Sequence, residues 1–232
     1  MRKSRSIRSY LTSQETISGA VYFAFQIFLL SGLLQWFNGK LSHPLNTAEL
    51  NFVYYLINFM AMLLIYHDFL GSSARQVGQH PAYFCQAVIL GFVAYYACNW
   101  AVSWVVRQLV PSFSNYNDEA IAAMAGGNYF LMVIGTVVLV PPAEECVFRG
   151  LIFRNLYGKS RWAAYIVSIL AFAVIHILGY IGRYSPLELL MAVLQYLPAG
   201  LCLAWAYTKA DTIFAPILIH ALINAYGIYQ MR

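Results

Sequence analysis

The sequence contains few charged residues. Asp, Glu, Lys and Arg make up 10% of its 232 residues, whereas soluble domains contain about 25%. Hydrophobic residues make up 61%, and the mean hydropathy is +0.62. Apolar runs of about 20 residues, the length of a membrane-spanning helix, alternate with short polar connections. This composition excludes a soluble globular domain and predicts a multi-pass protein of the cell membrane that is embedded in the lipid bilayer.

Several functional signatures are also missing. The four cysteines lie in separate apolar segments without C-x-x-C spacing, so neither a disulfide framework nor a thiolate metal site is indicated. The H-E-x-x-H signature of helical zinc proteases is absent. No inverted repeat of the transporter kind is visible, which argues against a small transporter. The net charge is +5, but the basic residues cluster at one set of loops, so no nucleic-acid partner is expected.

The apolar runs predict an all-α fold, a polytopic transmembrane bundle that forms a single integral membrane domain over residues 1–232. About seven membrane helices are expected, at residues 17–37, 52–69, 83–106, 129–157, 162–178, 186–208 and 212–229. A short interfacial helix is expected just before the fourth span, ending at Gly126-Gly127. Ser185 and Glu188 match a capping box at the start of the sixth.

Basic residues precede the first span, and no A-x-A-like cleavage site follows it. This basic cluster consists of Arg2, Lys3, Arg5 and Arg8. Since positive residues favour the cytoplasmic side of a membrane, we expect a cytoplasmic N-terminus.

The fourth span contains the pair Pro141-Pro142 in its interior. Paired prolines remove two amide donors and free carbonyl groups one turn earlier. At membrane depth, free carbonyls are tolerated only where protein or a wet cavity satisfies them. The sequence therefore predicts a broken helix at Pro141-Pro142.

Charged residues follow the prolines directly, at Glu144, Glu145 and Arg149. Each ionised side chain at the centre of a bilayer costs about 2.5–3.5 kcal/mol on insertion scales. Glu145 and Arg149 are four residues apart, in the order that favours an ion pair on one helix face. Glu144 lies about 100° around the helix and has no local partner. Either the run is a solvated helix end at the membrane surface, or Glu144 meets a partner from another helix.

Polar residues recur on two later apolar helices. His176 follows Phe172 by four residues, and His220 precedes Asn224 by four, so each pair shares a helix face. A lone histidine among apolar residues is commonly a core group, and a His–Asn pair can join two helices. Taken together with the carboxylates, these ionisable groups inside membrane helices indicate a functional site.

This set of side chains suits hydrolysis of a peptide bond. A carboxylate can act as the general base toward water, and a histidine can hold that water or protonate a leaving amine. A second histidine and an asparagine amide can donate to a developing oxyanion. The alternative is that Glu and two His ligands hold Zn²⁺ with one position left for water.

The motifs Glu144-Glu145-x-x-x-Arg149, Phe172-x-x-x-His176 and His220-x-x-x-Asn224, on successive membrane helices, resemble those of the CAAX protease and bacteriocin-processing family. That family contains the Ras-converting CAAX prenyl endopeptidases. The resemblance covers about residues 129–229, the expected catalytic core, and no motif position departs from it.

The resemblance implies an intramembrane endopeptidase with its site in a conical cavity. Glu144 and His176 would hold and activate the water, and His220 and Asn224 would stabilise the oxyanion. Glu145 and Arg149 would orient the site. The substrate would be a peptide or membrane protein, such as a prenylated C-terminus or a bacteriocin leader. The alternative function is a non-proteolytic membrane regulator, for instance a partner of a sensor kinase.

Two structural expectations follow. We predict that the side chains of Glu144, His176, His220 and Asn224 converge on one polar cavity. A rise of about 1.5 Å per residue nevertheless places Glu144 and His220 roughly 8–12 Å from the cytoplasmic edge and His176 about 20 Å from it.

We also predict a catalytic site without metal. Arg149 is placed to engage one of the two carboxylates, and a base at Glu144 would leave no spare acid as a ligand. If the enzyme depends on Zn²⁺, the ligands would be Glu144, His176 and His220.

Overall fold

A computed structural model describes residues 10–230, which form helices and no strand. The basic cluster before residue 10 and Arg232 lie outside the described residues, so the orientation of the chain in the membrane stays a prediction. The α-helices are α1 (Ser13–Phe25), α2 (Ser31–Asn38), α3 (Thr47–Ile65), α4 (His67–Gln79), α5 (Pro81–Leu109), α6 (Tyr116–Val133), α7 (Val140–Glu145), α8 (Asn155–Tyr157), α9 (Arg161–Ile177), α10 (Pro186–Ala210) and α11 (Phe214–Gln230). Three π-helical segments, η1 (Gln26–Leu30), η2 (Ile134–Leu139) and η3 (Cys146–Arg154), and the 3₁₀ turn η4 (Leu178–Tyr180) join or extend them.

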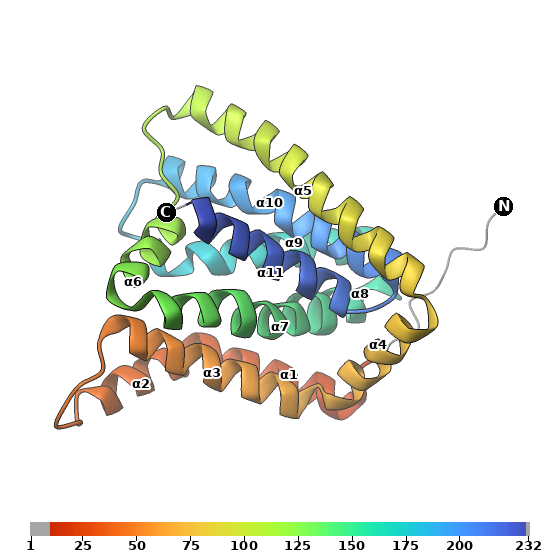
Figure 1. The fold of residues 1–232 in the computed structure, drawn as a ribbon, viewed down its shortest axis with the longest axis horizontal. Helices are drawn as coiled ribbons and strands as arrows, with labels where there is room; N and C mark the ends of the chain where they lie inside the picture. The colour runs from red at the N-terminus through yellow and green to blue at the C-terminus, as the bar shows by residue number, and fades with distance from the viewer. Residues whose placement is uncertain (1–9, 231–232) are drawn as a thin grey trace.

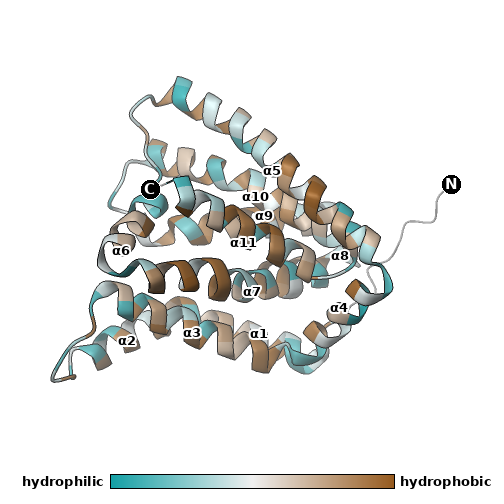
Figure 2. Ribbon diagram, in the orientation of Figure 1, coloured by the Kyte–Doolittle hydropathy of each residue, from teal (hydrophilic) through white to brown (hydrophobic). Residues whose placement is uncertain are grey.

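The all-helical membrane fold is confirmed. Within residues 10–230, 6 helices are long and apolar enough to cross a membrane. The last helix of the bundle, α11, has 17 residues and lies beside the membrane-spanning helices (Figure 1). Figure 2 shows apolar residues along the middle of the bundle and hydrophilic residues at many helix ends and connections.

The bundle is arranged around α10. In the most apolar stretch of α10, 50% of the residues are buried inside the protein, compared with 6% in the corresponding stretch of α5. It packs against α5, α9 and α11. The helices α1, α2 and α3 lie together along one edge of the bundle, and α5 slants along the opposite edge (Figure 1). The main core joins η3, α9, α10 and α11 through fully buried side chains such as Phe148, Phe172 and Leu203.

Glycines bring neighbouring helices into close contact. A Cβ atom added to Gly91 of α5 would lie 2.7 Å from Ile219 Cδ1 of α11. One added to Gly200 of α10 would lie 3.0 Å from Ile169 Cγ2 of α9. Small residues at such contacts are typical of membrane helix packing, because they let the backbones approach. The contact of Gly91 with Ile219 also shows which residues of α5 and α11 lie side by side.

The long helix of residues 116–157 is interrupted at Asn128. This residue has φ −158° and ψ 95°, and its Oδ1 accepts a hydrogen bond from Leu131 N at 3.2 Å. Asn128 therefore caps the segment that follows it. The separate helix expected to end at Gly126-Gly127 is present up to this kink.

At Pro141-Pro142 the interruption takes another form. Leu139 and Val140 keep right-handed helical backbone angles, and π-helical turns η2 and η3 flank the prolines. Val140 N donates to Gly135 O, five residues earlier. The wider π turn accommodates the prolines without a non-helical break, so the predicted broken helix is a helix with altered hydrogen bonding. The capping box predicted at Ser185 and Glu188 is confirmed.

A buried carboxylate joins α1 to α4. Glu15 is 3% exposed, and its Oε1 accepts a hydrogen bond from Phe69 N at 2.8 Å. Its Oε2 accepts another from Thr12 N at 2.7 Å, which completes the capping box of α1. One side chain therefore satisfies backbone amides at the beginnings of two helices.

Replacing Glu15 by alanine is expected to lower the free energy of unfolding by about 2–3 kcal/mol, because Phe69 N would be left buried without its charged acceptor. The apparent melting temperature in detergent should fall by about 4–12 °C. Gln14→Ala, at an exposed position of the same helix, serves as the control. Equal melting temperatures for the two variants would contradict this role of Glu15.

Candidate active site

Glu144 meets two histidines from other helices. Its Oε2 lies 3.7 Å from His176 Nε2 of α9 and 3.9 Å from His220 Nε2 of α11. The three side chains are 25%, 13% and 7% exposed, respectively, so Glu144 is the most exposed of the three. The missing partners of Glu144 therefore come from distant parts of the chain, and three of the four side chains predicted to converge meet here.

Each histidine ring is oriented through its other nitrogen. His176 Nδ1 lies 2.7 Å from Phe172 O, and His220 Nδ1 lies 2.9 Å from Glu145 Oε1. A carbonyl and a carboxylate are acceptors, so both Nδ1 atoms carry hydrogen. Both Nε2 atoms then face Glu144. The ring of His176 is also stacked on Tyr196, with centroids 4.3 Å apart.

The predicted pair of Glu145 and Arg149 is fully buried. Arg149 Nη1 donates to Glu145 Oε1 at 3.1 Å, and Nη2 donates to Gly200 O of α10 at 3.1 Å. The guanidinium lies over the ring of Phe172, 4.6 Å from its centroid. Because Glu145 also holds His220, this ion pair fixes one wall of the site and leaves Glu144 as the accessible carboxylate.

Asn224 satisfies a carbonyl that the proline pair leaves free. In the π turn η2, Thr136 O would accept a hydrogen bond from residue 141, but Pro141 has no N–H. Asn224 Nδ2 donates to Thr136 O at 2.8 Å instead. The contact places the Asn224 amide in the cavity wall next to His220, and the second hydrogen of its amide has no partner among residues 10–230.

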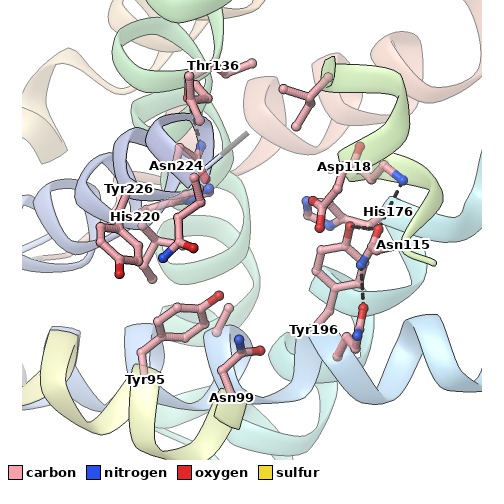
Figure 3. A pocket seen from close by; sticks show the side chains of 18 of the residues that line it. Tyr95, Asn99, Asn115, Asp118, Thr136, His176, Tyr196, His220, Asn224 and Tyr226 are labelled. Carbon is pink, nitrogen blue, oxygen red and sulfur yellow. Dashed lines mark hydrogen bonds between the residues drawn. The ribbon is translucent and has the colours of Figure 1, made fainter. Parts of the chain in front are cut away.

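A cavity of about 760 Å³ lies at this site. Figure 3 shows His220, Asn224 and Tyr226 on one side, Tyr196, Asn115 and Asp118 opposite, and Tyr95 and Asn99 pointing inward from α5. The predicted residues Glu144, His176, His220 and Asn224 all line it. Glu145 and Arg149 lie behind the wall.

Sequence reasoning missed the contribution of α5, α6 and α10 to this cavity. Asn115, which caps α6, donates to Gln195 Oε1 at 2.8 Å and accepts from Tyr196 Oη at 3.3 Å. Tyr196 in turn supports His176. For α5, the sequence did contain a pattern that could have indicated this contribution. Polar residues recur every fourth position, on one helix face, at Asn99, Ser103 and Arg107.

The depth difference expected between the predicted residues is wrong. Glu144 precedes the end of α8 by 13 positions and His176 follows the start of α9 by 15, so both lie about 20 Å from that connection. The start of α11 is itself inside the protein. Thr212 is fully buried there and donates to Ser73 O of α4 at 2.8 Å. His220 therefore reaches the same level after fewer turns.

The three potential zinc ligands do not form a tetrahedral set. Ligand atoms about 2.1 Å from Zn²⁺ would be about 3.4 Å apart, whereas Glu144 Oε2 lies 3.7 and 3.9 Å from the two Nε2 atoms. Among the described residues, no group of three or more His, Cys, Asp or Glu side chains is placed to hold a metal ion. Glutamate and histidine side chains are suitable zinc ligands, but the distances between Glu144 and the two histidines are longer than a tetrahedral zinc site requires.

Comparison with known families identifies the segment that carries this site. Residues 126–226 match the family described as type II CAAX prenyl endopeptidase Rce1-like. This segment is therefore similar to the Rce1-like family. The match begins next to the kink at Asn128, covers all the predicted site residues, and confirms the resemblance that their motifs suggested.

Three known proteins are similar to part of this chain. The UPF0177 protein YxdF of Lactococcus lactis is 27% identical over 90 residues, 39% of this chain and 44% of that protein. The protein named "Putative membrane peptidase YdiL" of Bacillus subtilis is 29% identical over 97 residues, 41% of this chain and 35% of that protein. The UPF0177 protein YaiF of Lactococcus lactis is 29% identical over 91 residues, 39% of this chain and 36% of that protein. The chain thus spans less than half the length of each relative, and no solved structure matches it significantly.

Proposed function

We propose that this chain is an intramembrane endopeptidase that hydrolyses a peptide bond with a water activated by Glu144. One observation carries the proposal: a partly exposed carboxylate faces two oriented histidine Nε2 atoms, at 3.7 and 3.9 Å, in a cavity among membrane helices. The match of residues 126–226 to the Rce1-like family and the similarity to a protein named as a membrane peptidase support the reaction class.

In the proposed mechanism, Glu144 and His176 hold the attacking water. His176 donates its Nδ1 hydrogen to Phe172 O, so its Nε2 carries a lone pair that accepts one hydrogen of the water. The Glu144 carboxylate takes the other hydrogen as the water oxygen bonds to the substrate carbonyl carbon. When the C–N bond breaks, Glu144 delivers this proton to the leaving amine, so the carboxylate is regenerated.

The oxyanion that forms at the carbonyl oxygen is placed against His220 and Asn224. The two carboxylates of the site carry two negative charges, and Arg149 balances one of them. The proposed role of His220 requires both ring nitrogens to carry hydrogen, so that Nδ1 donates to Glu145 and Nε2 donates to the oxyanion. Asn224 contributes its remaining amide hydrogen. The proposed substrate is a peptide segment of a membrane-associated protein.

The activity can be tested with the purified chain in proteoliposomes and a pool of synthetic peptides of known sequence in H₂¹⁸O. Mass spectrometry should find new carboxyl termini that each carry one ¹⁸O atom. Correctly folded protein that yields no labelled terminus above the level of empty liposomes would contradict the proposal and favour a non-proteolytic membrane role.

Cleavage is expected to proceed without a bound metal. After treatment with a chelator and removal of the chelate, the rate on the best-cleaved peptide should stay within about twofold of the untreated rate, since proton transfer by Glu144 needs no metal-bound water. Metal content is measured on the same samples. Loss of activity that added Zn²⁺ restores, with one zinc per chain, would assign Glu144, His176 and His220 as ligands instead.

A further inference from the structure

A stripe of polar side chains on α5 faces the cavity without a partner. Asn99, Ser103 and Arg107 recur every fourth residue and all line the cavity. None makes a side-chain hydrogen bond or ion pair with another residue in the range 10–230. Arg107 lies in the last turn of α5, where a basic residue is ordinary. Asn99 lies ten positions before the helix ends, where an unpaired carboxamide in a membrane helix indicates a function.

A second carboxamide lines the cavity from α10. Gln195 Oε1 accepts a hydrogen bond from Asn115 Nδ2 at 2.8 Å, which fixes the orientation of its amide. Its Nε2 has no partner among the described residues, so two N–H groups are free for a ligand. Asn99 points into the same cavity from α5, on the side that faces Tyr196 and Asn115 (Figure 3).

The contacts between α5 and α11 give the offset of Asn99 from the proposed catalytic residues along the helix axes. A Cβ atom at Gly91 would meet Ile219, and the rings of Tyr96 and Tyr226 are 5.1 Å apart, so the two helices run in the same direction along this contact. Asn99 is eight positions after Gly91, and His220 is one position after Ile219. With a rise of about 1.5 Å per residue, Asn99 lies roughly 10 Å beyond His220 along the helix axes. An extended chain covers that distance in about three residues.

We propose that Asn99 and Gln195 form a subsite that binds the backbone of an extended substrate peptide, about three residues from the scissile bond. A carboxamide offers a donor and an acceptor, as a peptide unit does, so it pairs with the main chain rather than with a particular side chain. The subsite therefore selects an extended conformation and tolerates different side chains at that position. This inference rests on the proposed function.

A backbone scan tests the subsite. The best-cleaved peptide of the pool is resynthesised with one N-methylated residue at a time, which removes one backbone donor per peptide. In the wild type, methylation about three residues from the cleaved bond should lower kcat/KM roughly tenfold, as expected for one lost hydrogen bond. In Asn99→Leu the same methylation should cost less than about twofold, because the partner is already absent. Side-chain substitutions at that position should change wild-type cleavage less than about threefold.

Ala97→Leu is the matched control, since Ala97 is exposed on α5 and lies outside the cavity lining. It should show the same methylation profile as the wild type. Equal methylation penalties in the wild type and Asn99→Leu would overturn the subsite while leaving the peptidase in place. If the wild type cleaves no peptide, the subsite is tested by the binding of fluorescein-labelled pool peptides to the wild-type chain and to Asn99→Leu. Binding lost in Asn99→Leu would keep the subsite without the peptidase, and binding unchanged or absent would reject the subsite.

Discussion

Replacing Glu144 by glutamine is expected to lower kcat/KM for peptide cleavage by a factor of about 10²–10⁴, the range for loss of a general base. The amide keeps the size of the side chain and can still hydrogen-bond, but it cannot take a proton from water. Glu144 is 25% exposed, whereas Glu145 is fully buried and engaged by Arg149 and His220. The base should therefore be Glu144 and not its neighbour.

Melting temperature and cleavage together separate this role from a structural one. Glu144→Gln should melt within a few degrees of the wild type, because Glu144 Oε2 makes no hydrogen bond within the described residues. Glu119→Gln, an exposed carboxylate on α6 outside the cavity lining, is the control and should cleave normally. A Glu144→Gln variant that retains more than about one tenth of the wild-type rate would exclude Glu144 as the base.

Replacing Arg149 by methionine is expected to lower the free energy of unfolding by about 3–5 kcal/mol, the range for removing one partner of a buried ion pair. Both Arg149 and Glu145 have side chains that are 0% exposed. Methionine has a similar length and is apolar, so it would leave Glu145 buried with only His220 beside it. The loss should appear as a much lower melting temperature in detergent.

The double variant Arg149→Met with Glu145→Leu shows whether the charge left behind causes this loss. Removing both charges should restore a large part of the stability, since isosteric apolar replacement of a buried pair is often neutral. Arg183→Met, at an exposed arginine, is the control for the substitution itself. If the double variant is as unstable as Arg149→Met, packing rather than charge would account for the effect.

The sequence predicted the site because its signals are local. Spacings of four place Glu145 beside Arg149 and His220 on the face of Asn224, and low polarity elsewhere makes these residues conspicuous. The helices follow from the same contrast between apolar runs and polar connections. The kink near Gly126-Gly127 and the disturbance at Pro141 follow from residue types that break helical hydrogen bonding.

What the sequence could not predict depends on how the helices rotate and where they begin. Tyr196 and Gln195 lie in an apolar run, and only the packing of α10 turns them toward the cavity. The buried start of α11 at Thr212 depends on its contact with α4. The pairing of Asn224 with Thr136 O requires knowing that η2 is π-helical, which shifts the freed carbonyl by one residue.

The central claim is that Glu144 and His176 act on one water molecule, and a double-mutant cycle on the best-cleaved peptide tests it most directly. The variants are Glu144→Gln, His176→Phe, which keeps a ring against Tyr196, and their combination. Residues that act as a unit give non-additive losses. The double variant should therefore cleave within about threefold of the more impaired single variant. Losses that multiply, or a His176→Phe variant as active as the wild type, would contradict the shared water.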